Sequence, residues 1–282
     1  LTRIFAARSP TEGFRAVSSA GAAITARLRY LITGTKRWMP SDGHAVGKSL
    51  CAADAWSSPG AEMETESLLG KCIQSSFRPA WWLRGPNGQT LWASTVRRAP
   101  KPQLRRERIE LPDGDFLDLE WAIGGTGPVV LLLHGLEGSV ESNYAAGLLK
   151  VLQKRGYTAV LMHFRGCSGE PNRLARGYHS GETGDLAHVV AMLRERLPDR
   201  AIGVVGYSLG GNVLLKWLGE SGDAAPVDAA VAVSVPFLLG CVADRLEVGF
   251  SRLYQWVLLR RMRVNLRRKM RLVRMPLEQM DL

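Results

Sequence analysis

Residues 202–217 read IGVVGYSLGGNVLLKW: a short apolar run, a serine bracketed by glycines, and an amphipathic helical pattern. This order of strand, turn and helix around G-x-S-x-G is typical of a nucleophile elbow, in which the serine occupies a strained turn. Gly206 and Gly210 would let the strand and the helix approach each other closely. The alternative is a glycine-rich turn in which Ser208 only caps the helix. We favour the nucleophile, because the flanking strand and helix provide the context that the motif requires.

Strands and helices alternate on both sides of this stretch. The sequence predicts a β-hairpin at 105–122, buried strands at 129–133, 158–164, 201–206 and 229–235, and helices at 143–155, 185–197 and 209–218. Apolar strands that alternate with helices indicate βαβ units and a mostly parallel sheet. We therefore expect an α/β core over residues 63–235 and the start of a helical cap over 236–282.

Residues 1–62 differ from the rest of the chain. They are rich in Ala, Ser, Gly and Arg, poor in acids, and lack a sustained strand alternation. Three interpretations compete: a transit-like targeting segment, a disordered extension, or upstream sequence translated by mistake with Met63 as the true start. We favour the last, because organised sequence begins just after Met63.

Composition narrows the class of protein. No apolar run reaches the roughly 18 residues that a membrane-spanning helix needs. Four cysteines lie scattered without C-x-x-C spacing, which favours reduced thiols over a zinc site or a disulfide framework. We expect a cytoplasmic protein that holds no metal and no cofactor.

The formal net charge is +11, and a large share of the excess lies in residues 260–274. Apolar residues interleave with the cations there. We favour a solvated helix face whose arginine stems cover apolar surface. The alternative is a basic amphipathic helix that contacts anionic lipid or an acidic partner. Nucleic-acid binding rests on net charge alone, because no basic-aromatic repeat continues beyond residues 77–92, and we do not expect it.

An acyl-transfer serine needs oxyanion donors and a base. The loop after the strand at 129–133 would supply one donor, the Leu136 N–H, and the helix start would supply the Leu209 N–H. We interpret His134 as a structural residue that holds this loop by a hydrogen bond, not as the general base. The other histidines are interpreted as structural or lie in residues 1–62: His163, His179, His188 and His44.

Three segments carry a family resemblance: HGLEGS-x-x-S-x-Y (134–144), HFRGCSGEPNR-x-x-x-x-YHSGETGD (163–185) and GYSLGGN (206–212). They resemble the YheT-like esterases, also called AB-hydrolase family 4, and the similarity covers about residues 75–275. It implies an α/β-hydrolase fold and a Ser–Asp–His hydrolase of small-molecule carboxylic esters that needs no cofactor. Ser208 matches the family nucleophile. Asn87 departs from the pattern, since many members have His there.

The resemblance also implies an acid and then a base after the last strands of the sheet. No histidine follows His188, and we assign the acid to neither Asp244 nor Asp281, which lie in the cap-like stretch and at the chain end. We therefore expect the triad Asp and His to be absent, the last strands to be missing, and the chain to be truncated at its C-terminal side. We also expect an exposed sheet edge and little or no turnover. The alternative is a non-catalytic binding or membrane-surface protein on a partial hydrolase scaffold.

Overall fold

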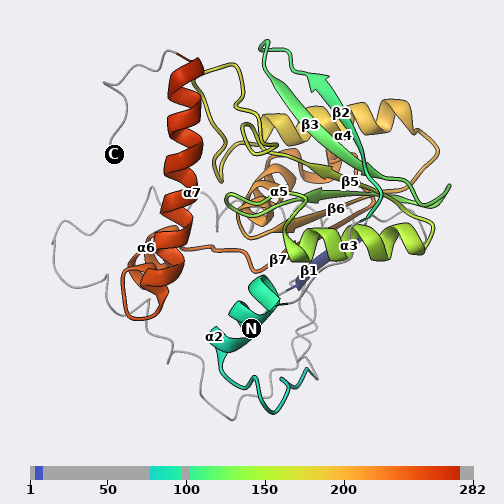
Figure 1. The fold of residues 1–282 in the computed structure, drawn as a ribbon. Helices are drawn as coiled ribbons and strands as arrows, with labels where there is room; N and C mark the ends of the chain where they lie inside the picture. Colours follow the sequence, from blue (N-terminus) through green and yellow to red (C-terminus); the bar gives the residue numbers. More distant parts are fainter. Residues whose placement is uncertain (1–3, 9–76, 97–101, 274–282) are drawn as a thin grey trace, which may run out of the picture.

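The computed structural model describes residues 4–8, 77–96 and 102–273 of the 282. They form one seven-stranded sheet in the order β1-β7-β6-β4-β5-β3-β2 (Figure 1). The strands are β1 (Ile4–Arg8), β2 (Arg105–Glu110), β3 (Phe116–Ala122), β4 (Val129–Leu133), β5 (Thr158–Met162), β6 (Ile202–Tyr207) and β7 (Ala229–Val233). The sheet agrees with the predicted α/β-hydrolase architecture.

The centre of the sheet is parallel. Strand β4 pairs in parallel with β5 and β6, and β6 pairs in parallel with β7, so that Leu131 lies opposite both Val160 and Val204. The predicted hairpin is confirmed: β2 and β3 are antiparallel, and β3 joins the sheet antiparallel to β5. The carboxyl ends of the parallel strands lie at the same end of the sheet, so the loops that follow β4 and β6 come together there.

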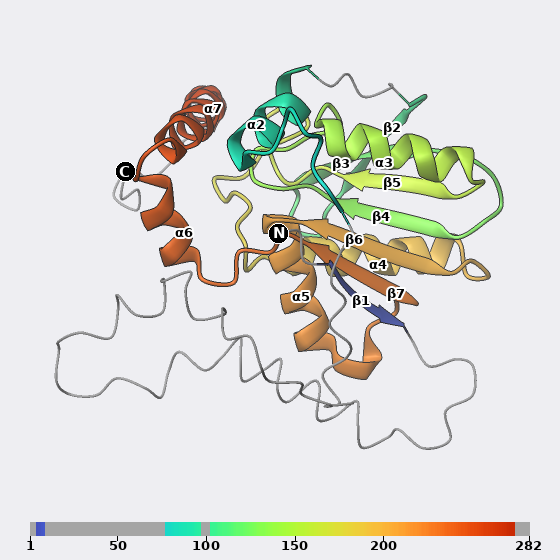
Figure 2. The same cartoon turned by 90° about the horizontal axis from the view of Figure 1, so that it is seen from below.

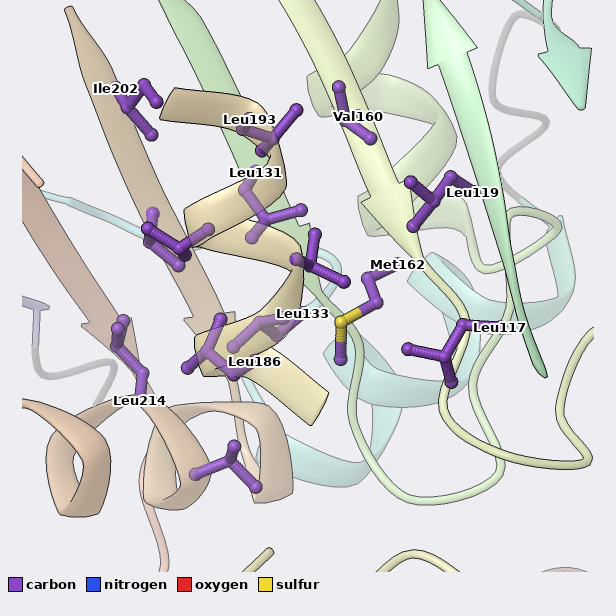
Figure 3. Close-up of a cluster of buried hydrophobic side chains, with 14 of the residues drawn as sticks. Leu117, Leu119, Leu131, Leu133, Val160, Met162, Leu186, Leu193, Ile202 and Leu214 are labelled. Atoms are coloured by element: carbon purple, nitrogen blue, oxygen red, sulfur yellow. The ribbon is translucent and has the colours of Figure 1, made fainter. Parts of the chain in front are cut away.

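Helices cover both faces of the sheet, as Figure 2 shows. The helices are α3 (Asn143–Lys154) on one face and α4 (Gly184–Arg196) and α5 (Leu209–Ser221) on the other, and a short turn η4 (Gly222–Ala224) follows α5. Side chains of β4 alternate between these layers. Leu131 and Leu133 pack with Leu186 and Leu193 of α4 (Figure 3), and Leu132 packs with α3. Burial on both faces explains why β4 is apolar throughout.

One edge of the sheet differs from the expectation. Strand β1 pairs antiparallel with β7, from Ile4 opposite Val233 to Arg8 opposite Ala229. The edge of β7 is therefore paired, and β1 is the outermost strand on this side of the sheet. Residues 4–8 therefore form a strand, although five residues are too few to show as a sustained alternation in the sequence. Residues 9–76 lie outside the described part, and the boundary at residue 62 stays a prediction.

Two helices extend from the sheet as a hairpin, in agreement with the helical segment expected after β7. They are α6 (Leu239–Leu246) and α7 (Ser251–Leu272), shown in red tones in Figure 1. The short helix α2 (Pro86–Leu91) and the π-helical turn η3 (Trp92–Val96) belong to the described segment 77–96. Tyr254 of α7 donates to the Asn87 side chain at 3.2 Å. Every helix of the described residues is too short or too polar to cross a membrane.

The cysteines correct another expectation. Cys167 is a free thiol, but Cys241 takes part in a disulfide bond. The prediction that the thiols are reduced is therefore wrong for Cys241. Sequence spacing gave no sign of this bond, because disulfide formation depends on the distance between Cβ atoms in the fold and not along the chain.

Candidate active site

Ser208 lies on the sharp turn that joins β6 to α5. Its backbone has φ 52° and ψ −114°, a conformation that residues other than glycine adopt only where the surroundings impose it. The surroundings do so by hydrogen bonds: the Ser208 N–H donates to Val233 O at 2.9 Å, and the Ser208 carbonyl accepts from Gly211 and Asn212. The side chain is partly exposed, as expected for a nucleophile elbow.

Glycines around the turn remove the atoms that would block it. A Cβ on Gly206 would lie 2.5 Å from the Gly210 carbonyl oxygen, and a Cβ on Gly210 would lie 2.7 Å from the carbonyl oxygens of Leu133 and His134. The predicted close approach of strand and helix is therefore confirmed. Gly135 brings a second loop to the serine, because its Cβ would lie 3.3 Å from the Ser208 Cβ.

Two tyrosine hydroxyls hold this loop on either side of Leu136. The Gly135 N–H donates to the Tyr144 hydroxyl at 2.9 Å, and the Glu137 N–H donates to the Tyr178 hydroxyl at 2.9 Å. The Leu136 N–H between them has no partner among the described residues, and neither has the Leu209 N–H at the start of α5. We call Tyr144 and Tyr178 the tyrosine bracket. Neither tyrosine was singled out from the sequence, although both lie within the family segments.

His134 has the structural role that the sequence predicted. It is fully buried, its Nδ1 donates to the Gly135 carbonyl at 2.7 Å, and its Nε2 accepts from the Phe164 N–H at 3.1 Å. These partners fix one neutral tautomer. Burial lowers the pKa of His134 to about 3. With both nitrogens engaged, His134 has no free position from which to take a proton from Ser208.

Neither His163 nor His179 hydrogen-bonds to Ser208. His163 is buried, with its Nε2 3.7 Å from a Glu120 carboxylate oxygen, and the His179 Nδ1 accepts from the Gly181 N–H at 3.1 Å. Within the described ranges, no imidazole or carboxylate hydrogen-bonds to Ser208. The same residues contain no group of His, Cys, Asp and Glu suited to a metal ion.

A buried ionic cluster fixes the loop at 163–185. The Arg165 guanidinium binds Asp185 through two hydrogen bonds of 2.8 and 2.7 Å, and its third nitrogen contacts Asp113 at 2.7 Å and Asp115 at 3.0 Å. Burial alone would raise the pKa of Asp115, but hydrogen bonds led by that of Asn172 hold it below its usual value. The cluster joins residues about 50 positions apart, so the sequence gave no sign of it.

The long helix α7 is attached to the same loops. Lys269 is nearly buried, and its Nζ donates to the Asn172 side chain at 2.8 Å and to the Arg176 carbonyl at 2.6 Å. Asn265, one turn earlier, donates to the Glu137 carboxylate beside Leu136. These bonds fix which face of α7 is directed toward the site.

A cavity of about 1750 Å³ lies between α7, the loop at 137–144 and the loop at 165–178. Its lining combines apolar side chains, among them Trp256, Val257 and Leu266, with six cationic side chains of α7. Ser208 is not part of the lining. Tyr144 lines the cavity, and together with Tyr207 it also lines a second space of about 300 Å³. The cavity therefore adjoins the elbow through the tyrosine that holds Gly135.

Comparison with known proteins defines the class. The family model for the alpha/beta hydrolase fold matches residues 128–278, more than half of the chain, so the chain belongs to this family. The predicted resemblance to the YheT-like esterases is also confirmed. The putative esterase YheT of Escherichia coli is 48% identical over 186 residues, which are 64% of this chain and 55% of that protein.

Other relatives are more distant. Mouse phospholipase ABHD3 is 30% identical over 199 residues, 67% of this chain and 48% of that protein. The chain thus spans about half the length of these curated relatives. Among solved structures, a Pyrococcus furiosus esterase is similar at 23% identity and a TM-score of 0.35, covering 42% of this chain and 51% of that one.

Proposed function

We propose that the site hydrolyses carboxylic esters through an acyl-enzyme on Ser208. The observation that carries this proposal is the strained, partly exposed Ser208 at the start of α5, next to the loop of Leu136. In the proposed reaction the Ser208 oxygen attacks the ester carbonyl, and the alcohol leaves with a proton. Water then hydrolyses the acyl-serine and releases the acid.

The oxyanion of each tetrahedral intermediate would accept hydrogen bonds from the Leu136 and Leu209 N–H groups. Two features support this assignment: both amides lack a partner among the described residues, and Leu209 lies at the positive end of a 13-residue helix. The tyrosine bracket would keep Leu136 available, because it occupies the amides on either side. One lost oxyanion donor typically costs about 10²- to 10³-fold in rate.

The proposed substrate is a small-molecule ester, and no cofactor is required. The names of the relatives support this class, since one is a putative esterase and another a phospholipase. The apolar part of the cavity lining under α7 supports an ester with an apolar acyl group.

We further propose that the 282-residue chain by itself turns esters over slowly. Within the described ranges no base contacts Ser208, and no histidine follows His188 in the sequence. Loss of the base lowers serine hydrolase rates on the order of 10⁴- to 10⁶-fold.

The experiment is hydrolysis of p-nitrophenyl acetate by the chain and by Ser208→Ala, with and without added imidazole as a diffusible base. We expect a low rate that imidazole raises only when Ser208 is present, since the alanine variant accounts for the reaction of imidazole itself. Robust hydrolysis without imidazole that Ser208→Ala abolishes would show that the chain supplies its own base. Equal rates for both proteins at every imidazole concentration would refute Ser208 as the nucleophile.

A further inference from the structure

The hairpin of α6 and α7 exposes an unusual amount of apolar surface. Trp256 is 57% exposed and Val248 is 61% exposed. Further large apolar side chains exposed at this end of the hairpin include Phe237, Leu238, Leu239, Val242, Phe250, Leu253 and Val257. A fully solvated helix surface would carry polar side chains at these positions.

Next to this apolar end, α7 carries a dense positive charge. Seven arginines of the helix are exposed: Arg252, Arg260, Arg261, Arg263, Arg267, Arg268 and Arg271. The sequence contains no Asp or Glu from residue 248 to residue 272, so no acid in this stretch offsets them. The Arg260 guanidinium lies 5.5 Å from the Trp256 ring, at the boundary between the apolar and the charged part.

The inner face of α7 is already occupied. Asn265 and Lys269 bind the core loops, and they lie one turn apart on one side of the helix. At 100° per residue, Trp256, Arg263 and Arg267 lie on the opposite side of the helix axis, and these exposed side chains also border the cavity beside α7. We call this side, together with the apolar end of the hairpin, the outer face. It is long, basic and partly apolar, and no described element covers it.

We propose that the outer face binds the surface of an anionic phospholipid membrane. The apolar end would enter the boundary between headgroups and acyl chains, and the arginines would contact lipid phosphates. Both halves of the surface are needed for this fit. A nucleic acid would match the arginines but leave the apolar end in water. The proposal does not depend on the chemistry of Ser208.

The test is flotation of the 282-residue chain with two kinds of vesicle. One contains equal parts of phosphatidylcholine and phosphatidylglycerol, and the other contains phosphatidylcholine alone. We expect binding to the first kind only, with release at high salt because ions screen the arginines. The double variant Arg263→Ala, Arg267→Ala should bind about 25-fold more weakly, about fivefold for each cation removed. Trp256→Ala should also weaken binding, since it removes apolar surface.

The matched control is the double variant Lys154→Ala, Arg155→Ala. It removes the same charge from exposed positions at the end of α3, and binding should change less than twofold. Ser208→Ala should bind as the wild type does. The proposal is overturned if both double variants weaken binding equally, if neutral vesicles bind as well as anionic ones, or if the chain binds duplex DNA but neither kind of vesicle. Circular dichroism of each variant shows whether the fold is retained.

Discussion

The contact between β4 and α5 makes Gly210 a sensitive test of the elbow. A Cβ at this position would lie 2.7 Å from His134 O, 2.7 Å from Leu133 O and 2.8 Å from Leu133 Cβ. Two of these atoms belong to the backbone, so strand or helix must move. Overpacking of this kind costs up to about 3 kcal/mol, and the better helix propensity of alanine returns about 1 kcal/mol. We therefore expect Gly210→Ala to lower the free energy of unfolding by about 2 kcal/mol.

Gly147 provides the matched control. It also lies within a helix, α3, but a Cβ there would meet no atom within 4 Å outside its own helix. Gly147→Ala should therefore raise the free energy of unfolding by about 1 kcal/mol. Urea unfolding followed by tryptophan fluorescence measures both variants. If Gly210→Ala is as stable as the wild type, or shifts the midpoint in the same direction as Gly147→Ala, then the elbow is not packed as described.

Three further predictions concern the residues that hold the site. His134 has a pKa near 3 in the folded protein against 6.5 for an ordinary histidine, so below pH 6.5 the unfolded chain takes up a proton that the folded protein does not. As the pH is lowered from about 6.5 to 4.5, the contribution of His134 to the free energy of unfolding should therefore fall by about 1.4 kcal/mol per pH unit. Urea unfolding of the wild type and of His134→Gln across this range tests this prediction. Parallel pH profiles of the two proteins would contradict it. Arg165→Met leaves the two buried carboxylates of Asp115 and Asp185 without this cation and should lower stability by about 4 kcal/mol in the same assay. A loss below about 1 kcal/mol would show that the cluster is not structural. Tyr144→Phe removes the acceptor of the Gly135 N–H, a loss of about 1 kcal/mol, so exchange of that amide measured by NMR should become about fivefold faster; unchanged exchange would rule out the tyrosine bracket.

The elements with strong local signals could be predicted from sequence. The apolar run of β4, the hairpin of β2 and β3 and the glycines of the elbow each reveal their structure within a few residues. The structural role of His134 followed from its place after a buried strand, and both of its hydrogen bonds agree with that role.

Features that join distant parts of the chain could not be predicted in the same way. Arg165 binds aspartates on two other elements, and Tyr178 reaches the loop of Leu136 from 41 residues away. Strand β1 is recognisable only by its partner β7. In each case the contact depends on the fold that surrounds it, and a pattern along the chain does not encode the partner.

We propose that Ser208 is a nucleophile placed beside two amide donors. The most direct test is reaction with a fluorophosphonate, which phosphonylates activated serines, followed by peptide mapping by mass spectrometry. We predict one adduct, on Ser208, that forms faster with added imidazole and is absent from Ser208→Ala. An adduct on another residue, or none at all even with imidazole, would contradict the assignment of Ser208 as the nucleophile.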